Sequence, residues 1–495
     1  MLTRTKPPIA VRPAERDSID DVPRLRGETE ALIEEARQRQ RRRRLGVFVV
    51  VAAAAGASAL AFGVMRDSGG RTAIEHVPNG PVVNVSAFAR HGSLAFISRN
   101  ALWVLDGTKH SLYRMPPLAG RFTPQQPLFS PDGRWLAYLV RSSNGVTPDQ
   151  LWIANGDGTD AHVVSGVPIT SVVGWSPRHD LFAFLAGPER SGRPCPCFTA
   201  TTLRVVAPDG RSRILVRAPW VYGAVWSPAG DALAVTTVRG DNGSSLATYP
   251  VSGARRTVWL AMRRDDRLKG MRQVILGAAG WWKNGIGVWV FGNGMIHNND
   301  ATPLDLVSAP GARPRLLGRT LSDGTTDVVA ASPTGSLAVV TDHGGGRSAW
   351  QDKQVELCGA AARCKKIDIG KAHVTVEPVW LPDGKTLAFV EAPNNRVGPW
   401  TQKNVAAWFS AHRVWLYNAA GGKRREFAVA RGATALTWSR DGASLLYVKN
   451  NSLWLLPKSS GRPVEIAAPL FPPGNWSQYY AQIPWTAQFA WSMNR

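Results

Sequence analysis

Four cysteines are the residues of this chain whose type and spacing most directly suggest chemistry. Cys358 and Cys364 flank Gly-Ala-Ala-Ala-Arg, between Gln354-Val355-Glu356-Leu357 and Lys365-Lys366-Ile367. This pattern places the two thiols opposite each other at the mouth of a hairpin. We therefore predict a disulfide bond between them. It would close a short loop and contribute roughly 2–3 kcal/mol at most.

The second pair, Cys195-Pro196-Cys197, allows three interpretations. A disulfide across one intervening residue is strained and easily reduced, but it would stiffen a loop. We favour this disulfide between Cys195 and Cys197, and free or intermolecularly paired thiols are the second interpretation. A redox dithiol is the third interpretation, although no thioredoxin-like βαβ pattern surrounds the pair. An enzyme or redox protein that uses Cys195 and Cys197 therefore stays an alternative.

Other catalytic and metal-binding motifs are missing from the sequence. It contains no Gly-x-Ser-x-Gly nucleophile elbow, no His-Glu-x-x-His, no phosphate-binding loop and no calcium loop. His297-Asn298-Asn299-Asp300 offers oxygen ligands without the spacing of a metal site, and we interpret it as a turn. His343, His373 and His412 share no spacing. The sequence thus predicts no catalytic residue, no metal and no cofactor.

The element that organises the chain is a turn, best seen at Ser130-Pro131-Asp132-Gly133. Proline sets φ at the first corner, aspartate bonds to the backbone ahead and glycine supplies the positive φ. Copies begin at Ala89, Ser130, Ser176, Ser227, Trp282, Ser332, Leu381 and Ser439. Their predicted structural turn residues are Pro131, Asp132, Gly133, Pro228, Gly230, Pro333, Gly335, Pro382, Asp383, Gly384, Asp441 and Gly442.

A short apolar run follows each turn, such as Leu136-Ala137-Tyr138. Such runs are too short for a helix and are typical of strands covered on both faces. In several copies a second strand, a polar hairpin and a third strand follow. Together with the strand that enters the turn, each repeat therefore contains four strands. We predict an all-β fold, a β-propeller of eight four-stranded blades over 82–495. Seven blades are the alternative, if the unit at Ala89 only completes the ring.

The Ser-Pro-Asp-Gly turn followed by Leu-Ala-Tyr or Leu-Ala-Phe resembles the repeat of TolB-like β-propellers, a WD-repeat-like family. The resemblance covers the chain from about Val82 to its C-terminus. It implies a periplasmic or surface protein that binds other proteins or envelope components. Trp175-Ser176-Pro177-Arg178-His179 lacks the turn glycine, and Trp281-Trp282-Lys283-Asn284-Gly285 lacks serine and proline, so the pattern is weakest in those two blades.

The N-terminal part predicts a membrane anchor. Residues 1–44 form a charged cytoplasmic arm, disordered at first and helical from Glu28 to Arg44. Residues 45–65 carry no charge and are long enough to cross a hydrocarbon core of about 30 Å as one transmembrane helix. Residues 66–81 form a polar linker. The basic residues before the span place the N-terminus in the cytoplasm and the propeller outside the cell membrane. A cleaved signal peptide is the competing interpretation and gives the propeller the same location.

The C-terminal segment predicts how the ring closes. Ala490-Trp491-Ser492 falls where a ninth repeat would begin, close to the last residue, Arg495. We expect Phe489 to Ser492 to complete the first blade as a strand, because this would remove a free sheet edge.

The formal net charge of the chain is +23, from 59 basic and 36 acidic residues. Up to Met65 there are 12 basic and 8 acidic residues, so the remainder has 59 − 12 = 47 against 36 − 8 = 28, or +19. A basic propeller outside the cell favours an anionic envelope polymer or lipid headgroups as partners. Its location disfavours nucleic acid.

Tryptophans suggest two roles. Trp175, Trp226, Trp380 and Trp438 share one repeat position and should pack between blades. Trp350, Trp400 and Trp408 fall in long loops, where they either anchor the loop or grip a ligand.

The function that the sequence predicts is a non-catalytic, extracytoplasmic binding scaffold that is anchored in the membrane by one span. It would recognise a protein or a cell-envelope component through the loops at the rim or channel of the propeller. The alternatives are a transmembrane sensor that couples ligand binding to the cytoplasmic arm, and the redox protein described above.

Overall fold

The computed structural model describes one unit of the chain, within Arg71–Arg495. It describes residues 74–76 and 80–493, except 117–121, 143–148, 188–199, 240–242, 269–272, 293–301, 321–327, 345–349, 360–363, 396–400, 458–460 and 472–482. The predicted arm (1–44) and span (45–65) lie outside these residues, as do Cys195, Cys197, His297–Asp300 and Trp400. Within the described ranges, no helix has the length and apolarity needed to cross a membrane.

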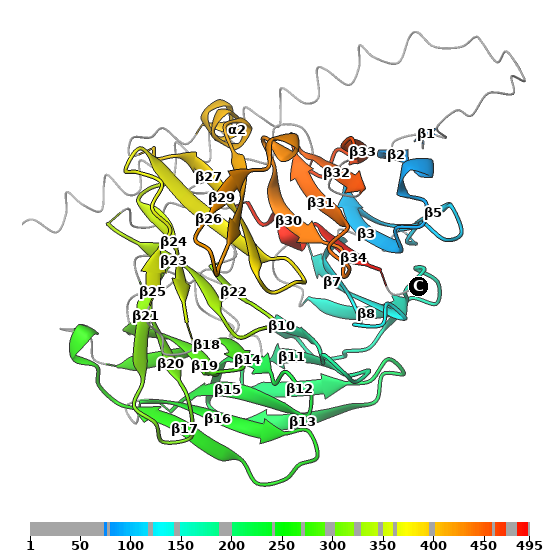
Figure 1. The fold of residues 1–495 in the computed structure, drawn as a ribbon. Helices are drawn as coiled ribbons and strands as arrows, with labels where there is room; N and C mark the ends of the chain where they lie inside the picture. The colour runs from blue at the N-terminus through cyan, green and yellow to red at the C-terminus, as the bar shows by residue number, and fades with distance from the viewer. Residues whose placement is uncertain are drawn as a thin grey trace, which may run out of the picture. The chain divides into compact units, whose positions relative to one another are not determined.

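Eight antiparallel sheets follow one another along the chain, coloured from blue to red in Figure 1. Blade 1 consists of β34 (Phe489–Ser492), β3 (Ser93–Ser98), β4 (Ala101–Asp106) and β5 (Ser111–Arg114). Blade 2 consists of β6 (Phe122–Phe129), β7 (Trp135–Ser142), β8 (Gln150–Asn155) and β9 (His162–Val163). Blade 3 consists of β10 (Ile169–Trp175), β11 (Phe182–Ala186), β12 (Thr202–Val206) and β13 (Ser212–Arg217). Blade 4 consists of β14 (Trp220–Trp226), β15 (Ala232–Val238), β16 (Ser244–Pro250) and β17 (Thr257–Met262).

The second half of the ring repeats this order. Blade 5 consists of β18 (Val274–Trp282), β19 (Gly285–Gly292), β20 (Thr302–Val307) and β21 (Arg315–Thr320). Blade 6 consists of β22 (Val329–Ala331), β23 (Leu337–Asp342), β24 (Lys353–Cys358) and β25 (Cys364–Lys366). Blade 7 consists of β26 (His373–Trp380), β27 (Thr386–Pro393), β28 (Arg413–Asn418) and β29 (Arg424–Glu426). Blade 8 consists of β30 (Thr434–Trp438), β31 (Ser444–Lys449), β32 (Ser452–Pro457) and β33 (Val464–Ala468), extended by β2 (Val82–Asn84) and β1 (Ile74–His76).

The predicted eight-bladed, all-β propeller is therefore confirmed, and the seven-bladed alternative is wrong because the unit at Ala89 leads into a complete blade. The two repeats with the weakest turn motif also form complete blades, β10–β13 and β18–β21. In the part of the chain that the structure describes, helical structure is confined to connections between strands. It comprises η1 (Ser86–Phe88), η3 (Asp266–Leu268), α2 (Gln402–Ser410), η4 (Ala428–Ala430) and η6 (Trp485–Ala487).

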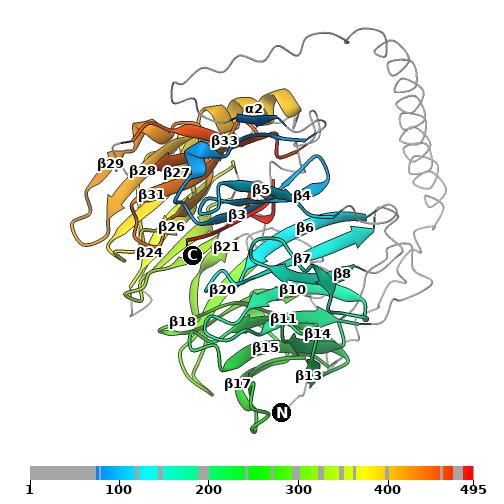
Figure 2. The same ribbon diagram turned by 90° about the vertical axis from the view of Figure 1, so that its right-hand side faces the viewer.

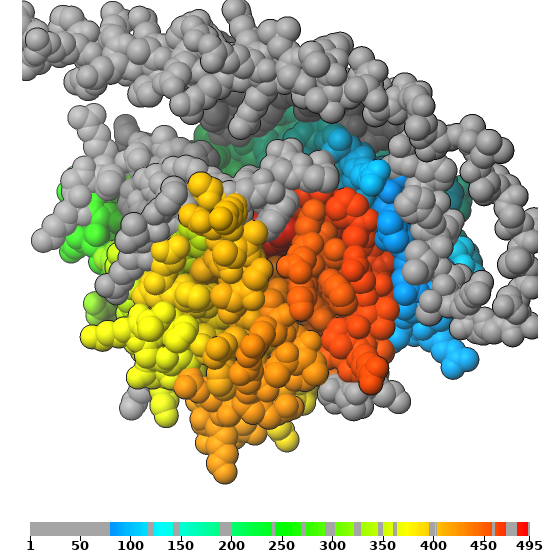
Figure 3. Space-filling view, turned by 90° about the horizontal axis from the view of Figure 1, so that it is seen from above, coloured from blue at the N-terminus to red at the C-terminus, as the bar shows by residue number. Residues whose placement is uncertain are grey.

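The ring closes at two places. The C-terminal strand β34 pairs with β3, with Phe489 opposite Phe96 and Ser492 opposite Ser93, which confirms the predicted closing strand. On the other side of this junction, β2 pairs with the outer strand β33 of blade 8, and β1 pairs with β2. Figure 3 shows blade 8, in orange and red, between blade 7 in gold and blade 1 in blue. Part of the predicted linker, 66–81, is thus strand.

The blades pack through faces that are apolar on both sides. In β7, residues Leu136 to Val140 are all buried, as the apolar runs predict. Three of the four repeated tryptophans donate from Nε1 to a carbonyl of the preceding blade, whereas Nε1 of the fourth, Trp438, is buried without a partner among the described residues. The three bonds run from Trp175 to Leu128 O (2.9 Å), from Trp226 to Gly174 O (2.9 Å) and from Trp380 to Ala330 O (3.1 Å). Each of these three indoles therefore buries a large apolar surface and satisfies its one donor.

Candidate functional site

The two ends of the blades are connected differently. At one end, which we call the turn face, lie the connections from the first to the second strand and from the third to the fourth strand of each blade. The longest of these is 308–314. At the opposite end, which we call the loop face, connections reach 394–412 and 469–488. A candidate site must therefore be judged separately on each face.

The turn face is built from the repeated turn. In the copies that end in Gly133, Gly230, Gly335, Gly384 and Gly442, the glycine φ lies between 63° and 101°. The glycine N–H donates to the first turn residue over 2.8–2.9 Å in all five copies. This is the positive-φ geometry that the sequence predicts. In the first copy, Ser130 Oγ also donates to Asp132 Oδ1 over 2.7 Å.

Neighbouring turns are also bonded to each other. Ser176 Oγ of blade 3 donates to Gly230 O of blade 4 over 3.0 Å, and Ser332 Oγ of blade 6 donates to Gly384 O of blade 7 over 2.8 Å. A Cβ at Gly230 would lie 2.4 Å from Ser176 Oγ. The glycines therefore have two roles. They permit the positive φ of the turn, and they leave space for the neighbouring turn. The turn face therefore leaves little space for larger side chains at these glycine positions.

The loop face carries α2, which lies over the end of blade 7 (Figures 1 and 2). The helix begins after Thr401, whose Oγ1 accepts from Asn404 N over 3.2 Å as an N-cap. Its apolar side chains Val405, Trp408 and Phe409 are buried. Trp408 Nε1 donates to Pro393 O over 3.0 Å, which fixes the helix to β27.

The tryptophans of the long loops anchor those loops. Trp350 is fully buried, and its ring meets the ring of Trp408 edge-on at 5.4 Å. Of the two roles that the sequence leaves open for Trp350 and Trp408, loop anchoring is the one observed. A grip on a ligand is wrong for these two, because neither ring reaches solvent.

His412 lies in the same aromatic cluster and is fully buried. Its Nδ1 faces Ala433 O at 3.1 Å, so Nδ1 carries the proton and donates. Nε2 has no partner among the described residues. Burial lowers the pKa of His412 to about 4, because an imidazolium would lose its hydration there. His412 is therefore a neutral core residue, as its isolation in the sequence suggests.

A pocket of about 230 Å³ opens beside α2 on the loop face. Its polar lining consists of His373, Glu391, Ser410, Arg413 and Arg431. The Glu391 side chain is only 7% exposed, and His373 Nε2, 3.6 Å from Oε1, is its sole ion-pair partner in the described part of the chain. Arg431 is engaged with Glu426 at 3.0 Å. A buried carboxylate beside guanidinium groups offers both acceptors and donors to a polar ligand group.

The strands around the ring axis contain unusual backbone. Gln126 in β6, Glu377 in β26 and Ala435 in β30 all have φ near 50° within or beside a register shift. Glu377 accepts bonds from Thr434 Oγ1 and Ala435 N, which joins blades 7 and 8. Positive φ at non-glycine residues stores strain, and such residues gather at functional sites. The bonds of Glu377 give a structural reason for the positive φ at Glu377 and at Ala435.

A buried ion cluster joins the loop between blades 4 and 5 to β20. Arg267 binds Asp305 through two bonds, Nη1 to Oδ1 at 2.8 Å and Nη2 to Oδ2 at 2.6 Å, and also binds Asp265. The carboxylates raise the pKa of Arg267, and bonding to the guanidinium holds the pKa of Asp265 below its usual range. Because one guanidinium bonds both carboxylates and thereby fixes the loop to β20, we interpret the cluster as a structural anchor.

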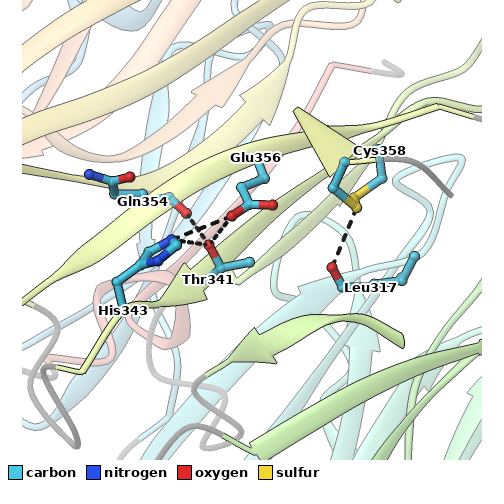
Figure 4. The surroundings of a disulfide bond; sticks show 7 residues. Leu317, Thr341, His343, Gln354, Glu356 and Cys358 are labelled. Carbon is cyan, nitrogen blue, oxygen red and sulfur yellow. Dashed lines mark hydrogen bonds and ion pairs between the residues drawn. A yellow bond between two sulfur atoms is a disulfide. The ribbon is translucent and has the colours of Figure 1, made fainter. Parts of the chain in front are cut away.

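Three catalytic residue types meet in blade 6, beside the disulfide (Figure 4). His343 Nε2 lies 3.0 Å from Thr341 Oγ1 and 3.4 Å from Glu356 Oε1. In a hydrolytic triad the hydroxyl and the carboxylate contact opposite ring nitrogens. Here both contact the same nitrogen, and Thr341 also bonds Glu356 directly over 2.8 Å and is buried. This cluster therefore lacks the geometry of a triad.

Cys358 and Cys364 form a disulfide, the pair for which the sequence predicts one. They face each other across the β24–β25 hairpin at the turn face, and Leu317 O of blade 5 lies 3.4 Å from Cys364 Sγ. Within the described ranges, no group of three or more His, Cys, Asp or Glu residues is arranged to hold a metal ion. Sequence reasoning missed Glu391 and Glu356, because each becomes a neighbour of a histidine only by strand pairing.

Comparisons with known proteins bear on the fold alone. No family model and no curated protein matches the chain. The structure of TolB from Acinetobacter baumannii is 14% identical, with 55% of this chain and 62% of that chain covered and a TM-score of 0.32. An oligogalacturonate lyase in complex with manganese is 11% identical, with 79% and 87% covered and a TM-score of 0.40. A prolyl endopeptidase structure is 12% identical, with 76% and 56% covered and a TM-score of 0.42. At these identities a function must be argued from the residues of this chain.

Proposed function

We propose that the chain is a non-catalytic binding scaffold, anchored in the cell membrane by residues 45–65, whose propeller binds a protein or a cell-envelope component outside the cell. The observation that carries this proposal is the contrast between the two faces. The turn face has short, repeated turns bonded to one another. The loop face has long connections of unequal length and the single α-helix of the described residues. A polar pocket lies there too, and pockets also lie on the turn face, beside Asp209 and beside Lys365.

The loop face suits recognition for a physical reason. Loops that stand on a rigid scaffold accept changes in sequence without loss of the core, and binding residues gather there. The aromatic cluster of Trp350, Trp408 and Phe409 holds the base of α2 rigid. The exposed residues Lys403, Ser410 and Arg413 are left free to contact a partner. Preorganised surfaces of this kind lose little conformational entropy on binding.

The pocket beside α2 is the best-defined part of this surface. Glu391 brings a buried acceptor, and Arg413 brings an exposed donor at the pocket edge. A partner side chain or chain terminus that carries both a donor and an acceptor would satisfy both groups. Burial makes such bonds stronger than they are in water. We expect this pocket to contribute specificity and the surrounding loops to contribute area.

Affinity capture from envelope extract tests the proposal. The full chain, solubilised in detergent, is compared with a pocket variant, Glu391→Gln with Arg413→Ala. A matched control, Asp209→Asn with Arg211→Ala, removes the same charges from an ion pair on the turn face. We expect one partner to be captured by the wild type and the control at high salt, and to be lost with the pocket variant.

Three other outcomes would contradict the proposal. Capture that disappears at high salt for all three proteins would show that only the net positive charge binds. Turnover of an envelope substrate by the purified chain would show an enzyme, and its loss in a Cys195→Ser variant would point to the alternative redox function. Capture through residues 1–44 alone would favour the transmembrane sensor instead.

A further inference from the structure

The chain enters the propeller from the turn face. Strand β33 starts at that face, because the hairpin from β32 precedes it, and it ends at Ala468 at the loop face. Val82 of β2 pairs with Ala468, and β1 runs antiparallel to β2 with Ile74 opposite Asn84. Ile74 therefore lies at the turn-face end of blade 8, on its outer edge. The connection to residue 73 therefore begins at that end of blade 8.

The predicted membrane span ends close to this point in the sequence. Only residues 66–73 separate Met65 from the first residue of β1. Even a fully extended chain covers at most about 3.6 Å per residue, which limits this connection to roughly 30 Å. The turn-face edge of blade 8 must then stay near the membrane surface if residues 45–65 cross the membrane.

The turn face, where Ile74 lies, also carries basic residues that form no ion pair among the described residues. We call the following six residues of blades 4 to 8 the basic sector. They are Arg255, Lys283, Lys365, Lys385, Lys423 and Arg462. All six are exposed, and none forms an ion pair with a carboxylate within the described part of the chain.

The carboxylates of the same blades are occupied by their own turns. Asp231 accepts from Ser227 Oγ over 2.7 Å, Asp383 accepts from Thr386 Oγ1 over 2.8 Å, and Asp441 accepts from Ser439 Oγ over 2.6 Å. On blades 2 and 3, Arg134 and Arg211 are paired with carboxylates, whereas Arg178 and Arg213 are exposed and form no ion pair in the described part of the chain. Unpaired basic residues therefore extend over much of the turn face, including blade 8, whose outer edge carries β1.

We propose that the basic sector rests on an anionic lipid surface and that the loop face points away from the bilayer. This inference rests on the proposed membrane anchoring and adds an orientation to it. Basic residues near an anionic leaflet each strengthen attraction by roughly fivefold, and this attraction falls off within a Debye length. The connection of at most roughly 30 Å holds the outer edge of blade 8 near the bilayer, and docking then brings the basic residues within a Debye length of about 8–10 Å. The loop face would then stand free to meet its partner.

Lysine footprinting tests the proposal on the full chain reconstituted in nanodiscs. One set of discs contains phosphatidylglycerol with phosphatidylcholine, and the other contains phosphatidylcholine alone. A water-soluble acylating reagent labels accessible lysines, which are quantified by mass spectrometry. The turn-face lysines Lys283, Lys365, Lys385 and Lys423 are compared with Lys371 and Lys403, which are exposed on the loop face.

We expect the turn-face lysines to be labelled several-fold more slowly in the anionic discs than in the neutral discs, and Lys371 and Lys403 to be labelled equally in both. Salt at about 1 M shortens the Debye length to roughly 3 Å and should remove the difference. In the variant Lys385→Glu with Lys423→Glu, protection of Lys283 and Lys365 should be lost. The matched variant Lys371→Glu with Lys403→Glu should keep it. All four positions are exposed, so these changes should leave the fold intact.

The outcomes separate the two proposals. A chain that stays with the disc at about 1 M salt but shows equal labelling of all lysines would overturn the docking and leave the anchor standing. Protection of Lys371 and Lys403 instead would place the loop face on the membrane and would also overturn the docking. A chain that leaves the disc at this salt concentration would overturn the anchor and, with it, the orientation proposed here.

Discussion

The two ends of the blades are held in different ways. On the turn face a short serine side chain of one turn donates to the glycine carbonyl of the next. On the loop face larger buried side chains make the contacts, through the aromatic cluster under α2 and the ion cluster around Arg267. The contacts between serine and glycine require the same turn in both neighbouring blades. The contacts of the larger side chains require only that a few anchors are buried, so the segments between them are free to differ.

Loss of an anchor on the loop face should have the largest effect. In Arg267→Ala, the buried Asp305, 1% exposed at its side chain, would keep a charge without its partner. We expect the free energy of unfolding to fall by about 3–5 kcal/mol, as measured by urea denaturation of the chain. Arg211→Ala is the matched control, because that arginine is paired with Asp209 over 2.6 Å but is 86% exposed. A similar loss in both variants would show that burial is not the cause.

A turn-face glycine should come next. Gly230→Ala would place a methyl group 2.4 Å from Ser176 Oγ and impose a positive φ on alanine, and we expect a loss of about 2–3 kcal/mol. Gly253→Ala has a similar φ of 84° but no atom within 4 Å, so it should lose only about 1 kcal/mol. Equal losses measured by chemical denaturation would mean that contact between turns contributes nothing.

Reduction of the disulfide should have a smaller effect. Cys358 and Cys364 are six positions apart, so the closed loop is short and its removal should cost about 2 kcal/mol. The measurement is thermal unfolding of Cys358→Ser with Cys364→Ser, beside the wild type with and without reductant. We expect reductant to lower the midpoint of the wild type toward that of the variant. A variant as stable as the oxidised wild type would contradict this prediction.

The smallest effect concerns pH on the loop face. His412 has a pKa of about 4 in the folded chain, against an ordinary value of 6.5. Between these values the unfolded chain binds more protons, so stability is complete above pH 6.5 and is lost as the pH falls toward 4. We expect a loss of about 1–2 kcal/mol at pH 5, seen by urea denaturation. His412→Phe should be less stable near neutral pH but should show a weaker dependence on pH. An unchanged pH profile in that variant would assign the dependence to other groups.

The strands beside the junction of the ring show where sequence patterns stop being informative. Phe489 to Ser492 was predictable as the closing strand because its position continues the spacing of the repeats. The strands β1 and β2 extend the outer edge of blade 8, yet Ile74–His76 lies in a polar stretch that reads as a linker. Such short strands carry too few residues for an alternating pattern, and their pairing is decided by the free edge of β33.

The sequence by itself determined the fold and the cysteine pairing in blade 6, whereas the choice between seven and eight blades needed the structure. The fold and the pairing depend on local stereochemistry, such as a positive φ at Gly133, that a few neighbouring residues specify completely. Only the tertiary structure decided the roles of Trp350 and Glu391 and the side from which the chain enters the ring. These depend on contacts between residues that are distant in the sequence. Their side chains follow no repeat, because burial and strand register, not local conformation, bring them together.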